Sequence, residues 1–541
     1  MTKHLLAAEA DRIQDLLFRS SQLREVVGGS QILKRFSEEV PTALIANLGL
    51  EISKDIDIIT ARGGSFYLEF SQRDTAKRFG QLLAEAYHRA SGGSLSVIEP
   101  VEYSGDERDY PLTSEKARIR LRAAKRRGSF RTVTQFPYIA FCESCGIGLA
   151  EAHEQPSTDE NEEGHYLCAA CRAKAAEQVD QSLGRFLKPF YAKIVEPNLL
   201  DERMEWPEDA DSVGQLDPRN YVAYIVADGN GMGRVFRHCT KSQASLLSEK
   251  MDEILQDSLA APIKLFLQEP AGNSLQQFIP TLPLIMGGDD LFALVPARWS
   301  LDIAGRLCQN FQTEMTRLGQ EIGVLAPSQA ITMTAAVVIC KANYPYYLAH
   351  EIGEKHLSES KRVVKALARD ENLNLSAVDF EVILGSQIAA ASRDQTGGYR
   401  PTLRPYWVVE SSAPPPREWG LLLHDLLEHR LTLAQYRLPA GRRSQLRELL
   451  DRASQQTDTT QWNQALGRML ERLERDRRWQ NQHPLRLALE ALGGAHLETW
   501  TEINRSSGQH WQGNGMGDLL RIWDWALRID EDPTNYEGGQ A

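Results

Sequence analysis

The sequence predicts a mixed α+β fold with an internal duplication, an insert between the two copies and a helix-rich end. Two glycine-containing hairpins, near residues 63 and 287, are each set among strand-like and helical stretches. Paired Cys-x-x-Cys motifs lie between them. A proline-rich segment at 413–416 then precedes a charged, helix-rich remainder. We therefore expect four parts, spanning residues 1–104, 105–215, 216–410 and 411–541.

Composition narrows the class of protein. The 541 residues provide room for three or four domains, and 42% hydrophobic with 25% charged residues is ordinary for a globular chain. The net charge of -12 gives no overall basic field for nucleic acid. The first residues carry charges too early for a signal peptide, and no apolar run approaches the length of a membrane span. With seven cysteines in so long a chain, we expect a reducing cytoplasm and no membrane partner.

The first copy of the duplication lacks acidic residues at its hairpin tip. Strand-like runs at 56–60 and 66–70 flank the tip residues Gly63, Gly64 and Ser65. A strand at 4–8 and helices at 11–18 and 22–36 precede this hairpin, and a helix at 73–90 follows it. Without carboxylates the tip should not hold catalytic metal ions. It either binds a nucleotide or is purely structural.

A basic run follows the first copy. It could contact RNA by displacing counterions, or it could be the solvated face of a helix. Its members are Lys116, Arg118, Arg120, Arg122, Lys125, Arg126, Arg127 and Arg131.

Four cysteines form the clearest metal signal. Cys142 and Cys145 make one Cys-x-x-Cys pair, and Cys168 and Cys171 make the second. Two such pairs in a reducing compartment predict one tetrahedral zinc ion that stabilises the fold without an open position for catalysis. A redox pair is the main alternative, and a histidine of the insert could replace one ligand.

The second copy begins with a buried strand that ends in an aspartate. The run 221–227 is closed by Asp228, and a glycine-rich loop then leads to a helix expected at 242–269. Such a loop presents free backbone N–H groups beside a carboxylate, an arrangement that suits phosphates. The loop residues are Gly229, Asn230, Gly231 and Gly233.

The second hairpin carries adjacent carboxylates at its tip. Apolar runs at 282–286 and 291–295 flank Gly287, Gly288, Asp289 and Asp290. The glycines leave room for a nucleotide, and the carboxylates suit hard divalent cations. A strand ending in aspartate, a helix and then this hairpin is the order of a palm-type nucleotidyltransferase or cyclase. In that arrangement carboxylates of neighbouring strands share two metal ions, so we expect two Mg or Mn ions on Asp228, Asp289 and Asp290.

The remaining stretches complete the domain and add a helical one. We expect helices at 301–318 and 346–367, and strands at 331–340 and 378–384. Residues 419–541 predict a helical bundle whose tryptophans belong to its core. The dipeptide His424-Asp425 lacks the further histidines that an HD nuclease needs, so we do not expect that activity.

The motifs resemble those of a known family, the large polymerase-like subunit of type III CRISPR effector complexes. The matching stretches are DRIQDLLFRSSQLREVVGGSQIL at 11–33, the four-cysteine insert, ADGNGMG at 227–233 and MGGDD at 286–290. The resemblance implies two facing ferredoxin-like palm domains, the first degenerate, and a zinc-ribbon insert. It also implies partner effector subunits, CRISPR RNA and target RNA. Family members often carry an N-terminal HD nuclease, whereas this chain starts at the first palm, so DNA cleavage is not expected.

The implied activity is the joining of ATP into cyclic oligoadenylates when the complex senses target RNA. Lys361 is placed like the lysine that contacts triphosphate in related palm enzymes, although it could equally be a surface lysine. One departure matters, because family members commonly have a second aspartate where this chain has Asn230. This departure keeps open a catalytically weak scaffold and RNA-binding subunit of the same complex. A stand-alone nucleotide cyclase is a separate alternative.

Overall fold

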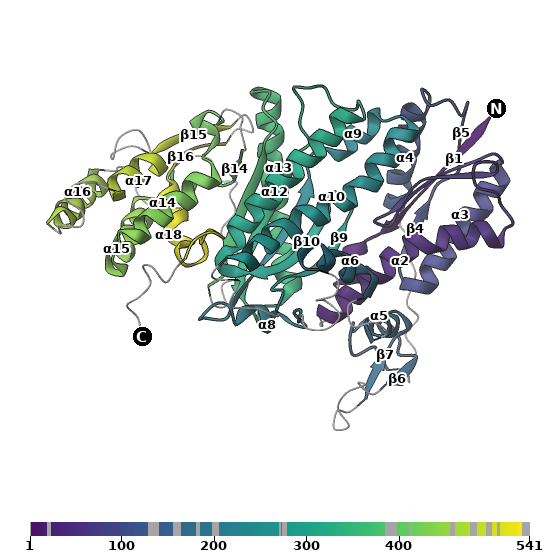
Figure 1. The fold of residues 1–541 in the computed structure, drawn as a ribbon, viewed down its shortest axis with the longest axis horizontal. Helices are drawn as coiled ribbons and strands as arrows, with labels where there is room; N and C mark the ends of the chain where they lie inside the picture. Colours follow the sequence, from purple (N-terminus) through teal and green to yellow (C-terminus); the bar gives the residue numbers. More distant parts are fainter. Residues whose placement is uncertain are drawn as a thin grey trace.

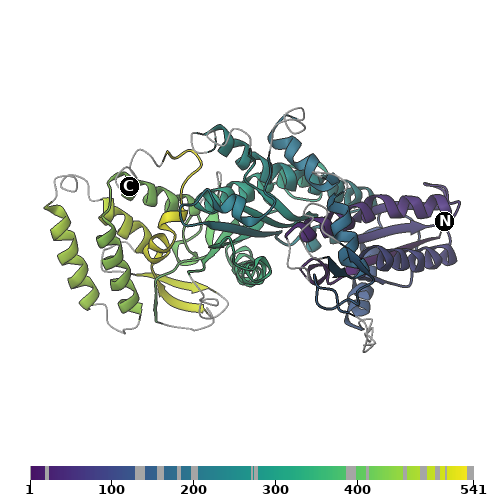
Figure 2. The ribbon, with the colours of Figure 1, turned by 90° about the horizontal axis from the view of Figure 1, so that it is seen from below.

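The chain forms an elongated molecule, described by a computed structural model. The first sheet lies at one end, the second sheet in the middle, and the C-terminal elements at the other end (Figures 1 and 2). The described residues are 2–18, 23–127, 140–154, 164–179, 184–196, 205–269, 272, 278–384, 398–409, 414–454, 460–475, 484–493, 500–505 and 509–532. Within these ranges no helix is both long and apolar enough to cross a bilayer.

The first sheet has the strand order β2-β3-β1-β4, with β5 paired to β1, and all its pairings are antiparallel. Helices α2 and α3 pack on it, and Phe36 of α2 meets Phe66 and Tyr87 edge to face in the core between them. The elements are β1 Lys3–Asp11, α1 Ile13–Leu17, α2 Leu23–Asn47, β2 Ile56–Arg62, β3 Ser65–Phe70, α3 Arg73–Ser91, β4 Ser94–Val97 and β5 Val101–Tyr103.

The second sheet repeats this topology and extends it. Its order is β14-β12-β11-β8-β10-β9, so β11-β8-β10-β9 matches β4-β1-β3-β2 of the first sheet. This repetition confirms the prediction of two ferredoxin-like palm folds. The elements are β8 Tyr221–Gly229, α9 Met232–His238, α10 Lys241–Gln268, β9 Leu282–Gly287, β10 Asp290–Pro296, η1 Ala297–Trp299, α12 Ser300–Glu321, β11 Met333–Lys341, α13 Tyr346–Asp370, β12 Ser376–Val382 and β14 Tyr406–Val408.

Strands β8 and β11 explain the continuous apolar runs in the sequence. Almost every residue of both strands is buried, because helices cover both faces of the sheet. Helices α10 and α12 pack against each other on one face, and α13, seen end-on below the sheet in Figure 2, contacts β8, β11 and β12. A strand that is covered on both faces has no solvent side, so polar alternation is lost.

The two palm units pack against each other reciprocally. Helix α2 of the first unit lies on β9 of the second hairpin, and α10 of the second unit lies on β2 of the first hairpin. The Ser30 hydroxyl of α2 donates to the Leu284 carbonyl of β9. The hairpin turns themselves meet, since a Cβ placed on Gly287 would lie 4.0 Å from the Cα of Gly63. The two glycine pairs therefore face one another.

The cysteine insert sits against the first unit. Its helix α5 crosses α2 so closely that a Cβ on Gly28 would lie 2.2 Å from the Lys174 carbonyl oxygen. The buried Lys174 ammonium donates to the Leu16 carbonyl of α1, so α5 is also bonded to a second helix of the first unit. The elements between the two palm sheets are α4 Tyr110–Arg127, β6 Ala152–Glu154, β7 His165–Leu167, α5 Ala169–Val179, α6 Gly184–Ile194 and α8 Ala210–Gly214.

The C-terminal part is mostly helical, as predicted, but it also contains a small sheet that the prediction did not include. A small sheet of order β13-β16-β15 accompanies the helices, and Tyr406 of the palm sheet donates to Asp518 of α18 at 2.8 Å. These strands were missed because they are short and Gln509–Gly513 contains little of the apolar alternation that marks a strand. The elements are β13 Tyr399–Arg400, η2 Arg417–Trp419, α14 Leu423–Gln435, α15 Ala440–Ser454, α16 Thr460–Glu474, α17 Pro484–Gly493, β15 Thr501–Arg505, β16 Gln509–Gly513, α18 Gly515–Arg521 and η4 Trp523–Trp525.

Candidate metal and nucleotide site

The second sheet brings three carboxylates together. Leu291 of β10 pairs with Ala227 of β8, which places Asp290 opposite Asp228 at the end of both strands. Asp289 precedes Asp290 in the hairpin turn, and one carboxylate oxygen from each of the three lies within 4.8 Å of the others. The strand register alone therefore converts two distant sequence motifs into one acidic cluster.

The turn geometry explains the order Gly-Asp. Gly287 pairs with Asp290, leaving Gly288 and Asp289 as a two-residue loop. Gly288 has φ +64° and Asp289 keeps a negative φ, the pattern of a type II′ turn, in which only the first central residue needs glycine. Asp289 can therefore occupy the second position without backbone strain.

Gly229 provides the space that Asp289 occupies. A Cβ on Gly229 would lie 2.9 Å from Oδ2 of Asp289 and 3.0 Å from its Cβ. Glycine is therefore required here because both the aspartate turn and Met232, whose Cγ would lie 2.8 Å from the same Cβ, approach the end of β8 closely.

The acidic cluster carries more negative charge than its surroundings neutralise. Burial between the units and the nearby Asp252 raise the pKa of Asp289 to about 6. Burial, Asp289 and Glu354 raise the pKa of Asp290 to about 7, although Asp290 keeps an exposed edge. Each ionised carboxylate makes ionisation of its neighbour less favourable, and a bound divalent cation would remove that unfavourable interaction. Three hard oxygen donors with an excess of negative charge fit Mg or Mn ions.

Lys361 supplies the nearest positive charge. Its ammonium, carried by α13, pairs with Oδ2 of Asp228 and donates to the Gly229 carbonyl at 3.3 Å. Burial and the neighbouring Lys365 lower the pKa of Lys361 to about 8. Lys361 therefore lies beside the acidic cluster, with 19% of its side chain exposed.

Asn230 points its amide toward β11. Its Nδ2 donates to Thr332 Oγ1 at 2.9 Å, and its Oδ1 accepts from Thr334 Oγ1 at 2.8 Å. These bonds hold the side chain to the neighbouring strand. The rest of the glycine-rich loop turns into α9, where the Gly233 carbonyl accepts from Arg118 Nη1 at 3.0 Å. Gly231 begins this helix with φ +72°.

The first hairpin has a different turn. Gly63 and Gly64 have φ +55° and +76°, and Arg62 pairs with Ser65, so the tip is a type I′ turn that needs glycine at both central positions. Gly64 also packs under α1, since its Cβ would lie 2.9 Å from the Ile13 Cδ1. This tip contains no carboxylate that could extend the acidic cluster.

A cavity of about 140 Å³ lies between the two units and reaches the acidic cluster. Gly63 and Gly287 both line it, Asp290 lies on its wall, and the other lining residues of the two units are apolar and polar in equal numbers. His350 and Glu354 of α13 line it as well. A cavity that combines apolar walls with polar groups suits a small organic ligand.

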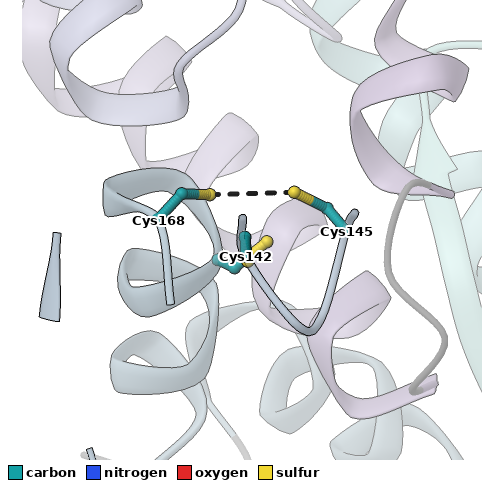
Figure 3. A group of neighbouring side chains, drawn as sticks. Cys142, Cys145 and Cys168 are labelled. Carbon is teal, nitrogen blue, oxygen red and sulfur yellow. Dashed lines mark hydrogen bonds between the residues drawn. The ribbon is translucent and has the colours of Figure 1, made fainter. Parts of the chain in front are cut away.

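The four cysteines also come together. Their sulfur atoms lie within 4.8 Å of one another. The Sγ atoms of Cys145 and Cys168 are 3.8 Å apart (Figure 3). The thiols of Cys168 and Cys171 hydrogen-bond to Cys145 and lower its pKa far below that of a free thiol. Four sulfur donors from two knuckles, with one already favoured as thiolate, fit a structural zinc ion. His165 instead pairs with Glu143 at 2.8 Å.

The basic run is only partly available to a ligand. On α4, Arg118 bonds to Gly233 and Lys125 pairs with Glu9 at 2.5 Å. Exposed members of the run are Lys116, Arg120, Arg122 and Arg126. Arg131 lies outside the described residues, as does the side chain of Arg127.

Sequence reasoning missed three polar groups of the site. Arg62 and Asp252 form an ion pair beside the turns, and Glu354 accepts from Gln14 in the same cavity wall. Arg62 had a visible signal, because it immediately precedes the glycine pair of the first hairpin. Asp252 and Glu354 lie within long helices whose charged residues all look alike in sequence.

The fold and the site define a palm-type domain, in which carboxylates cluster at the ends of adjacent strands and one of them, Asp290, lines a cavity. Residues 221–370 match the family model described as Cas10/Cmr2, second palm domain. This segment contains the acidic cluster and Lys361. A comparison with curated proteins gave no match.

Solved structures extend the likeness to nearly the whole chain. The apo Csm1-Csm4 cassette matches with a TM-score of 0.52 and 15% identity, covering 97% of this chain and 70% of that one. Csm1 in T. onnurineus matches with a TM-score of 0.54 and 14% identity, covering 97% and 69%. A Csm1-Csm4 cassette in complex with cA4 matches with a TM-score of 0.53 and 12% identity, covering 97% and 70%. The chain is therefore Cas10-like in fold.

Proposed function

We propose that this chain is the large, Cas10-like subunit of a type III CRISPR effector complex. In this proposal its second palm joins ATP molecules into cyclic oligoadenylates when the complex senses target RNA. The observation that carries the proposal is the acidic cluster of Asp228, Asp289 and Asp290, in a segment that matches the second palm of Cas10/Cmr2. A structure of similar fold whose name includes cA4 supports the class of product.

The three aspartates would hold two Mg or Mn ions. When bound, such ions neutralise the triphosphate, lower the pKa of the attacking hydroxyl and stabilise the leaving pyrophosphate. The carboxylates of the three aspartates are held at the ends of paired strands, so the site needs little reorganisation when a nucleotide binds.

The other residues of the site would bind and orient the nucleotide. Lys361 already lies at Asp228, and its ammonium would contact the triphosphate. The phosphates would be bound by the backbone of the glycine-rich loop, at Gly229, Asn230, Gly231 and Gly233. The missing side chains of Gly287 and Gly288 would let the nucleotide approach the turn. The cavity between the units would take a base.

The first hairpin would face that nucleotide from the other unit. Gly63 lines the shared cavity, and Gly64 and Ser65 continue the turn behind it. A second ATP seated there would place its hydroxyl toward the acidic cluster. Zinc on Cys142, Cys145, Cys168 and Cys171 would have a structural part only, because all four positions of a tetrahedral site would be filled by sulfur.

One observation favours the alternative of a catalytically weak scaffold. The amide of Asn230 is hydrogen-bonded to Thr332 and Thr334 and brings no charge to the site. A site with one carboxylate fewer binds metal ions more weakly.

The test is product analysis on the assembled complex. We expect purified complex with target RNA, ATP and Mn²⁺ to release pyrophosphate and to form cyclic oligoadenylates detectable by mass spectrometry. The variant with both Asp289→Ala and Asp290→Ala should form none while still binding target RNA. Wild-type complex that binds target RNA but releases no more pyrophosphate than this variant would establish the scaffold instead. Product formed by the isolated chain without RNA would favour a stand-alone cyclase.

A further inference from the structure

Asp252 connects the two palm units at the point where their hairpin turns meet. It lies on α10, and its two carboxylate oxygens have different partners. Oδ2 accepts from Arg62 Nη1 of the first unit at 3.0 Å. Oδ1 accepts from the backbone N–H of Gly288, within the turn of the second unit, at 2.5 Å. A single side chain thus joins the first hairpin to the turn that carries Asp289.

The turn of the second hairpin needs such an anchor. Gly288 has φ +64° in a two-residue loop, and glycine leaves the backbone there freer than any other residue would. Asp289 and Asp290 follow directly, and their mutual repulsion favours conformations that separate them. A charged hydrogen bond to the Gly288 N–H opposes that movement and fixes the backbone immediately before both carboxylates.

Arg62 makes this anchor compatible with a metal site. An ionised Asp252 adds a further negative charge close to Asp289. The Arg62 guanidinium compensates that charge, and the pair is mostly shielded, with 35% of the Arg62 side chain and 15% of the Asp252 side chain exposed. Arg62 is the last residue of β2, directly before Gly63, whose Cα lies against Gly287. The first unit therefore packs against the turn of the second hairpin through Gly63 and compensates the charge beside it through Arg62.

We infer that Asp252 is a positioning residue for the aspartate turn and that Arg62 makes docking of the first palm a condition for an ordered metal site. This gives the first palm a part in catalysis although its own tip has no carboxylate. The inference rests on the proposed function, because it assumes that Asp228, Asp289 and Asp290 bind metal ions.

Mn²⁺ binding to the purified full chain tests the inference, measured by calorimetry and by the paramagnetic resonance of free Mn²⁺. Asp252→Ala removes both hydrogen bonds, and we expect the dissociation constant for Mn²⁺ to rise about tenfold or more. Asp252→Asn keeps an oxygen for the Gly288 N–H, so it should restore part of the affinity. Arg62→Met should weaken binding several-fold, and adding it to Asp252→Ala should cause no further loss, because both changes interrupt the same connection.

The matched control lies on the same helix. Asp257 of α10 pairs with Lys193 at 2.7 Å, as Asp252 pairs with Arg62, but away from the turns. Asp257→Asn should leave Mn²⁺ affinity unchanged. A purely structural part for Asp252 would lower the melting temperature while the folded variant bound Mn²⁺ as tightly as the wild type. That result, or effects of Arg62→Met and Asp252→Ala that multiply, overturns the inference.

The same measurement separates this inference from the proposed function. If the wild-type chain binds Mn²⁺ no better than the variant with Asp289→Ala and Asp290→Ala, the proposed metal site is wrong and the inference falls with it. If the wild type binds and the Asp252 and Arg62 variants bind equally well, the metal site stands and only the inference falls.

Discussion

Gly229→Ala adds a single methyl group beside the acidic cluster. The added Cβ would lie 2.8 Å from Cγ of Met232 and 2.9 Å from Oδ2 of Asp289, where ordinary contact begins at 3.4 Å, so both side chains must move by about half an ångström. A misplacement of about 1 Å costs roughly a hundredfold in rate, so half of that predicts a loss of about tenfold in pyrophosphate release. Mn²⁺ affinity should fall in parallel, because the displaced group is a ligand.

The control for Gly229→Ala is Gly305→Ala in α12. Its Cβ would also meet an atom at 2.9 Å, the Cδ2 of Leu423, far along the chain from the acidic cluster. Neither glycine has a positive φ, so both variants introduce crowding without backbone strain, and both should be destabilised by about 1–3 kcal/mol. Only Gly229→Ala should lose activity in the pyrophosphate assay. Equal activity of the two variants at equal folded fraction would refute the close approach of Asp289 to Gly229.

Three further predictions concern charge and metal. Cys168→Ser should release one zinc ion per chain, measured by elemental analysis, and lower the melting temperature by about 5 °C or more; unchanged zinc content would exclude this ligand set. Lys361→Met should raise the KM for ATP about tenfold while Mn²⁺ still binds, because a tenfold change corresponds to the free energy of one charged hydrogen bond. An unchanged KM would exclude the contact between Lys361 and the triphosphate. Protons compete with metal ions at Asp289 and Asp290, whose pKa values are raised to about 6 and about 7. Mn²⁺ should therefore bind about tenfold more tightly at pH 8 than at pH 6. An affinity for Mn²⁺ that calorimetry finds independent of pH would contradict these shifts.

Much of the fold could be predicted because hydrophobic periodicity and glycine pairs are local signals. The sequence predicts the hairpin with Gly63 in its turn and the hairpin that carries Gly287, and both form with two-residue turns. The helix expected at 22–36 continues to Asn47 through Pro41, because tertiary packing on the first sheet stabilises the extra turns. The short α9 was missed, since seven residues after a glycine loop give no periodicity to recognise.

The acidic cluster could be expected only as a set of residues and not as a geometry. The proximity of Asp228 and Asp290 depends on the register of β8 against β10, which is a property of the folded sheet. The contacts of Asp252 join α10 to β2, far apart in the chain, and no local pattern indicates them. Likewise, the two threonines that bind the Asn230 amide lie on or beside β11, about a hundred residues away.

Anomalous diffraction tests the central claim most directly. Crystals of the chain with Mn²⁺ and a non-hydrolysable ATP analogue would be measured at the manganese absorption edge. We predict two peaks about 4 Å apart, both in contact with Asp228, Asp289 and Asp290 and with the phosphates of the analogue. Bound analogue with no manganese at these three carboxylates would contradict the two-metal site.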